Sequence, residues 1–87
     1  MIFFNVFIIH HPLIYPFITP FKYFCSIVSG PVSAEVTATE YNKMLEEGEY
    51  LASLAKNVAV KVPLTPAGLQ TCKALREKNI MVNHTKI

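Results

Sequence analysis

The feature that most constrains the fold of this chain is an alternation of short and long patterned segments after its first twenty residues. Residues 32–36, 58–62 and 80–85 are short and rich in Val, Ala and Ile, which is typical of strands. Residues 40–55 and 66–78 carry apolar residues at three- and four-residue intervals, which predicts helices. Strands that alternate with helices through short connections predict a parallel sheet with right-handed crossovers.

Helix-terminating residues support these boundaries. Residues 21–28 are typical of the end of an earlier helix, because a Ser-Gly-Pro break follows them. Thr39 suits the N-cap of the next helix, and Thr65 followed by Pro66 suits the N-cap and first position of the last one. Asn79 suits a left-handed position after that helix. The expected buried side of the last helix comprises Leu69, Cys72 and Leu75.

Each predicted strand has one apolar and one polar set of alternate positions. The apolar set comprises Val32, Ala34, Val36, Val58, Val60, Val62, Ile80 and Val82. The other set includes Ser33, Glu35, Lys61, Asn83 and Thr85. Because side chains alternate between the faces of a strand, one face meets the helices and the other is polar. A doubly wound sheet would cover that polar face with helices, whereas a barrel places polar groups at the C-terminal ends of its strands.

We therefore expect an α/β fold, a partial (β/α)8 TIM barrel with about three parallel strands and two intervening helices. Glu35, Lys61 and Thr85 each lie at or near the C-terminal end of a predicted strand. A single polar residue there is commonly an ordinary edge-of-sheet residue. Three of them in phase on consecutive strands favour a shared site.

The first part of the chain has a different composition. Residues 1–21 contain no charged side chain, and a run of about 20 apolar residues can span a bilayer. His10 and His11 interrupt the run, and three prolines in it each remove a helix hydrogen bond. No basic residue precedes Lys22, so the n-region of a signal peptide is lacking. We expect residues 1–20 to be a hydrophobic N-terminal extension, with a small membrane-associated protein anchored by residues 1–21 as the alternative.

Charge and cysteine content exclude some classes of protein. A net charge of +2 without a basic cluster does not favour nucleic-acid binding. Cys25 and Cys72 are too few for a disulfide scaffold and have no partners at zinc-ligand spacing. We therefore expect core cysteines in a reducing compartment, a cytoplasmic location, and no metal site.

Three stretches carry a resemblance to known proteins: GPVSAEV at residues 30–36, NVAVKVPLTPAGL at residues 57–69 and NHT at residues 83–85. They resemble segments of the transaldolase family, in the short branch that includes fructose-6-phosphate aldolase. The resemblance implies that residues 21–87 are a fragment of a transaldolase-like TIM barrel and that residues 1–20 do not match it. The lysine in VKVPLTPAGL disfavours another Schiff-base barrel, such as a deoxyribose-phosphate aldolase, whose lysine has a different local context.

The resemblance also implies roles for four residues. Lys61 matches the lysine that forms a Schiff base with a ketose, and Glu35 matches the carboxylate that relays protons through a water. Asn83 and Thr85 match a pair that positions the substrate. The implied substrate is a sugar phosphate of the fructose 6-phosphate class, handled without a cofactor by dihydroxyacetone transfer or aldol cleavage, as in the pentose phosphate pathway.

The resemblance is incomplete in ways that affect activity. Family members take an Asp and an Asn from their first two strands and a phosphate-binding Ser and Arg from later strands. Residues 1–20 show neither of the first two in a strand–helix context, and the chain stops at Ile87. We therefore expect this chain to be inactive alone, whereas full-length family members are expected to be homo-oligomers.

Overall fold

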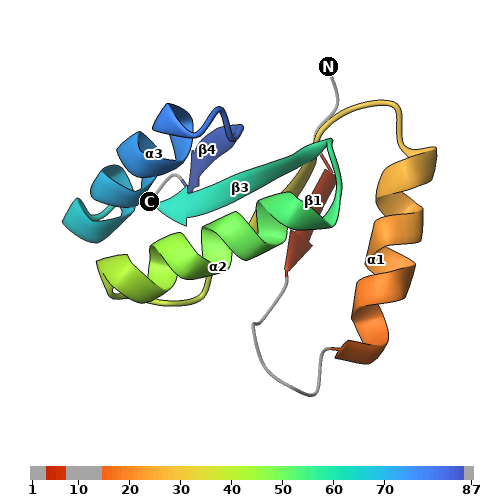
Figure 1. Cartoon of the computed structure of the whole chain (residues 1–87), viewed down its shortest axis with the longest axis horizontal. Coiled ribbons are helices and arrows are strands. Elements are labelled where there is room, and N and C mark those ends of the chain that lie inside the picture. The colour runs from red at the N-terminus through yellow and green to blue at the C-terminus, as the bar shows by residue number, and fades with distance from the viewer. Residues whose placement is uncertain (1–3, 8–14, 86–87) are drawn as a thin grey trace.

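A computed structural model describes residues 4–7 and 15–85, and side chains for residues 20–84. The strands are β1 (Phe4–Phe7), β2 (Val32–Glu35), β3 (Val58–Pro63) and β4 (Val82–Thr85). The helices are α1 (Tyr15–Ile27), α2 (Tyr41–Leu54) and α3 (Pro66–Glu77). All strands pair in parallel in one sheet of order β1-β2-β3-β4, and α2 lies across it beside α3 (Figure 1). The expected parallel α/β fold of a partial TIM barrel is confirmed.

The described residues form four strands and three helices, one strand and one helix more than the expected about three strands and two intervening helices. β1 pairs with β2, with Phe4 opposite Val32, and α1 begins at Tyr15. The sequence predicts only the end of α1, because Pro20 removes a backbone donor inside this helix. Residues 8–14 lie outside the described residues, and the division of the chain at residue 20 stays a prediction. No helix in the described part of the chain combines the length and hydropathy of a membrane span.

The core lies between the sheet and the helices. Its buried members include Phe21, Cys25, Val32, Ala34, Val36, Met44, Leu51, Val58, Val60, Val62, Cys72 and Leu75. The apolar set of alternate strand positions therefore meets the helices, as expected. Leu69 is an exception on α3, because it is 51% exposed rather than buried.

The two predicted N-caps have different outcomes. Thr65 caps α3, since its hydroxyl accepts a 3.0 Å hydrogen bond from the backbone N–H of Gly68. Thr39 does not cap α2, whose N-cap is Glu40 without a side-chain hydrogen bond. The Glu47 carboxylate instead accepts bonds from the backbone N–H and the hydroxyl of Thr37, so this α2 side chain holds the preceding loop.

Two asparagines lie next to the ends of regular elements, one after α3 and one before β3. Asn79 follows α3 with a φ of 61°, which confirms the expected left-handed position. Asn57 precedes β3, and its side-chain amide donates to the backbone carbonyls of Cys25, Val28 and Gly30. This amide fastens the end of α1 to the start of β3, which fixes where β3 enters the sheet.

Candidate active site

The strand register places three of the four candidate residues in one row. Lys61 on β3 lies opposite Glu35 on β2 and opposite Asn83 on β4. Neighbouring strands are about 4.8 Å apart, and residues that lie opposite each other point to the same face of the sheet. The side chains of the three residues therefore lie next to one another on one face. Thr85 lies opposite Pro63 and two residues beyond Asn83, which places it on the same face of β4. The Thr85 side chain lies outside the described residues.

The row sits where the sheet changes from core to surface. Glu35, Lys61 and Asn83 are half-buried, whereas Val60 and Val62, on either side of Lys61, are fully buried against the helices. The row also lies near the C-terminal ends of the strands, where barrel enzymes carry their catalytic groups. The amine, the carboxylate and the amide thus belong to partly exposed residues that the sheet backbone holds in place.

Asn83 makes a hydrogen bond that the sequence does not predict. Its Nδ2 atom donates a 2.9 Å hydrogen bond to the hydroxyl oxygen of Ser33, which is 1% exposed. The bond joins β4 to β2 across β3, where Ala59 lies opposite Ser33. A side chain as small as that of Ala59 leaves room for this bond. The other amide atom, Asn83 Oδ1, is buried and has no hydrogen-bond partner among the described residues.

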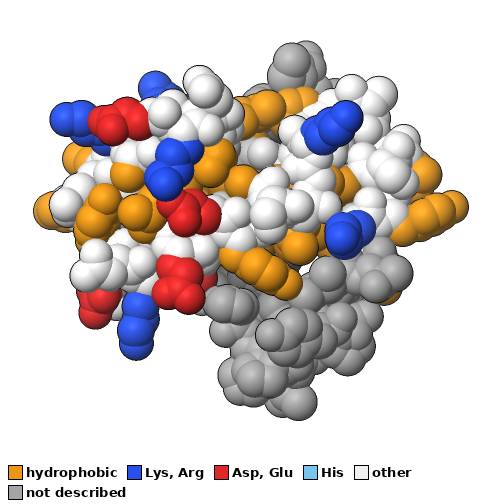
Figure 2. Space-filling view, in the orientation of Figure 1, with side chains coloured by type: hydrophobic (Ala, Val, Ile, Leu, Met, Phe, Trp, Pro, Cys, Tyr) orange, Lys and Arg blue, Asp and Glu red, His pale blue; other side chains and the backbone are white. Residues whose placement is uncertain are grey.

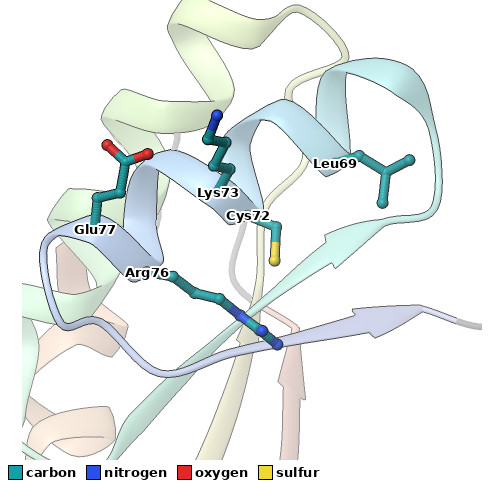
Figure 3. Close-up of a pocket in the computed structure, with 5 residues that line it drawn as sticks. All are labelled: Leu69, Cys72, Lys73, Arg76 and Glu77. Atoms are coloured by element: carbon teal, nitrogen blue, oxygen red, sulfur yellow. The ribbon is translucent and has the colours of Figure 1, made fainter.

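His84 occupies the opposite face of β4 from Asn83. Its Nε2 atom lies 3.5 Å from the sulfur of Cys72 on α3, so the imidazole belongs to the helix layer and not to the candidate site. Cys72 also lines an open hollow together with Leu69, Lys73, Arg76 and Glu77 (Figure 3). All five residues come from α3, and none belongs to the row on the sheet. The hollow is therefore separate from the candidate site.

The charged groups of the helices have structural roles. Figure 2 shows acidic and basic side chains interspersed over α2 and α3. Lys78 and Glu49 form an exposed ion pair at 2.9 Å, and the hydrogen bond to Glu49 raises the pKa of Lys78.

Burial raises the pKa of the Cys25 thiol, so this cysteine stays neutral in the core. Among the described residues, no three His, Cys, Asp or Glu side chains are grouped to hold a metal ion.

A family model described as Transaldolase/Fructose-6-phosphate aldolase matches residues 14–87. The chain belongs to this family. The match begins seven residues before residue 21, where the resemblance was expected to start, and it therefore includes all of α1. In this transaldolase-family chain, the row of Glu35, Lys61 and Asn83 lies within the matched part.

Curated relatives of this transaldolase-family chain carry the name "Probable transaldolase". That of Rhodospirillum centenum is 57% identical over 70 residues, which are 80% of this chain and 30% of the relative. That of Parvibaculum lavamentivorans is 61% identical over 61 residues, which are 70% of this chain and 28% of the relative. That of Mesorhizobium japonicum is 58% identical over 65 residues, covering 74% and 30%. The chain thus spans about 30% of the length of the curated relatives it matches.

Proposed function

We propose that this chain carries the Schiff-base portion of a transaldolase or fructose-6-phosphate aldolase site, with Lys61 as the nucleophile. The observation that carries the proposal is the row in which Lys61 lies opposite Glu35 and Asn83 on adjacent parallel strands. An amine, a carboxylate and a neutral amide on one face supply a nucleophile, a proton carrier and a hydrogen-bonding group. Membership of the transaldolase family supports the assignment.

The chemistry begins at the ketose carbonyl. The neutral Lys61 amine attacks the carbonyl carbon, and loss of water leaves an imine. Glu35 carries protons to and from this centre through a water molecule, because a carboxylate in direct contact would hold the lysine as an ammonium ion. The bond between the first and second carbons beyond the imine carbon then breaks: the hydroxyl on the second carbon loses its proton, an aldehyde leaves, and the electron pair forms an enamine. In aldol cleavage the enamine is protonated, and in dihydroxyacetone transfer it adds to a second aldehyde. In both cases water then hydrolyses the imine, which releases the product and frees Lys61.

Asn83 and Thr85 are proposed to bind the sugar phosphate. Both are uncharged, so they can hold substrate hydroxyls and the water without changing the charge of the lysine. The proposed substrate belongs to the fructose 6-phosphate class. The groups that bind its phosphate are proposed to come from other strands of a whole barrel, since the chain spans about 30% of its relatives.

The test uses a whole barrel. The aligned segment of the Rhodospirillum centenum relative would be replaced by that of this chain, and the chimera treated with fructose 6-phosphate and borohydride. Reduction of an imine fixes the sugar fragment to the lysine, which mass spectrometry then locates. We expect the adduct on Lys61 and its loss in Lys61→Arg, since arginine keeps the charge but does not lose its proton. Lys73→Arg, on α3, is the matched control and should leave the adduct unchanged.

An adduct on Lys73 or Lys78, with Lys61→Arg still active, would overturn the assignment. The unmodified relative serves as the positive control for the trapping chemistry.

A further inference from the structure

We propose that Ser33 is a positioning residue that orients the Asn83 amide so that its Oδ1 atom accepts a hydrogen bond from a substrate hydroxyl. The inference rests on the proposed function and deepens it. It assigns a role to a buried serine and a chemical class to the group that Asn83 binds.

The hydrogen bond between Asn83 and Ser33 constrains the Asn83 amide. An asparagine side chain offers two N–H donors and one carbonyl acceptor on a planar amide. Nδ2 of Asn83 is engaged by Ser33 Oγ at 2.9 Å, which fixes the plane and the side on which Oδ1 lies. Ser33 is 1% exposed and sits in a strand, so its hydroxyl is held by the sheet. The pair therefore holds the amide in one orientation before any ligand arrives.

The carbonyl oxygen of the same amide has an unused capacity to accept a hydrogen bond. Asn83 Oδ1 is buried and has no partner among the described residues. Buried polar atoms without partners cost free energy and are uncommon, so such an atom calls for an explanation. The register places Asn83 directly opposite Lys61, where the carbonyl carbon of a ketose would be bonded. A ligand on Lys61 would therefore be bonded to the strand next to this acceptor.

An acceptor atom at this position determines which chemical groups of a ligand can bind there. A carbonyl oxygen accepts hydrogen bonds and repels other acceptors, so Oδ1 selects an O–H or N–H group over a phosphate or carbonyl oxygen. In a ketose, the donors next to the reacting carbon are hydroxyl groups. The opposite arrangement, in which Ser33 donates to Oδ1 and leaves Nδ2 free, would select an acceptor instead. The two arrangements predict different ligands and can be distinguished.

The orientation of the amide can be measured in the 87-residue chain by nuclear magnetic resonance. In labelled protein, the Asn83 side-chain amide is identified by its absence in Asn83→Ser. We expect one Nδ2 proton to exchange slowly with water and to lose this protection in Ser33→Ala. Ser53→Ala is the matched control, because the exposed Ser53 hydroxyl bonds the Tyr50 carbonyl far from the row. Equal exchange in Ser33→Ala and the unsubstituted chain would overturn the inference.

The functional consequence can be measured in the chimera described above, with dihydroxyacetone and hydroxyacetone as probes. The second probe lacks one hydroxyl next to the carbonyl. We expect Ser33→Ala to slow borohydride-trapped adduct formation with dihydroxyacetone by about 10- to 100-fold, because small misplacements of a group that positions a substrate have effects of this size. The rate with hydroxyacetone should stay nearly unchanged. Ser33→Thr, which keeps the hydroxyl, should restore much of the rate with dihydroxyacetone.

Two failures are distinguishable. If Ser33→Ala leaves both rates unchanged or slows both equally, the positioning role is wrong while the Lys61 adduct, and with it the proposed function, still stands. If the unsubstituted chimera forms no Lys61 adduct with either probe, the proposed function fails and this inference fails with it.

Discussion

The Cα of Gly68 lies so close to the carbonyl of Pro63 that a Cβ at this position would be 1.8 Å from the carbonyl oxygen. Pro63 ends β3, two residues after Lys61, and Gly68 lies in the first turn of α3. The turn that follows the candidate nucleophile is therefore closed by contact between two backbones. Only glycine fits this contact without a shift of the strand end or of the helix.

Gly68→Ala is expected to destabilise the chain by about 1–3 kcal/mol, because the atom that a Cβ would meet is backbone and cannot rotate away. Gly48→Ala is the matched control. Its Cβ would meet the flexible end of Leu75 at 2.9 Å, and alanine also favours the helix, so a smaller loss is expected. Urea unfolding would measure both, and equal losses would contradict the argument.

Thr65→Ala is expected to lower the free energy of unfolding by about 1 kcal/mol, since the N-cap bond to the backbone N–H of Gly68 is lost. Thr39→Ala is the natural comparison, because Thr39 precedes α2 without capping it. We expect the Thr39 variant to unfold at nearly the same urea concentration as the unsubstituted chain. A loss at Thr39 as large as that at Thr65 would show that the capping assignments are wrong.

At alkaline pH, deprotonation of Lys78 should weaken its ion pair with Glu49 and with it the contact between α2 and α3. The hydrogen bond to Glu49 raises the pKa of Lys78 above its usual 10.5, so the folded chain holds this proton more tightly than the unfolded chain. The stabilisation is complete below the unfolded pKa and is lost as pH rises through the folded one. Glu49→Gln should reduce this loss of stability above about pH 10.5, measured as the difference between the two urea unfolding series. Since both side chains are exposed, the difference should be small and should shrink in high salt.

The 87-residue chain by itself is expected to show no measurable aldol or transaldolase turnover. Lys61 is half-buried in a sheet that has four strands in the described part of the chain, and such an open sheet does not exclude water as a closed barrel does. Without the substrate's phosphate held in place, binding energy cannot align the carbonyl with the amine. Turnover of fructose 6-phosphate by the purified chain would be compared with that of Lys61→Arg. Activity that disappears in the variant would contradict the prediction.

Much of the fold follows from local patterns in the sequence. The alternation of apolar and polar residues, as in Val60-Lys61-Val62, is sufficient to predict strands with one buried face. The Thr65-Pro66 pair predicts where α3 begins, and Asn79 predicts the left-handed residue that follows α3. Such features depend on the preferences of a few neighbouring residues, and so they can be recognised in one segment alone. The stretches that resemble the transaldolase family are equally local.

Other features depended on how the elements pack together. Leu69 has the spacing of a core residue but is exposed. β1 was not predicted, because a four-residue strand in a run without charged residues has too few positions to show a strand pattern. Its place is evident only from its pairing with β2.

The sequence by itself therefore determined the elements from residue 32 onward, their polar faces and the identity of the candidate residues. Only the tertiary structure decided that Glu35, Lys61 and Asn83 share a row, and that Asn83 reaches across β3 to Ser33. Register and cross-strand contacts join residues up to 50 positions apart in the chain. They are decided by the packing of whole strands and helices against one another, which no single segment encodes.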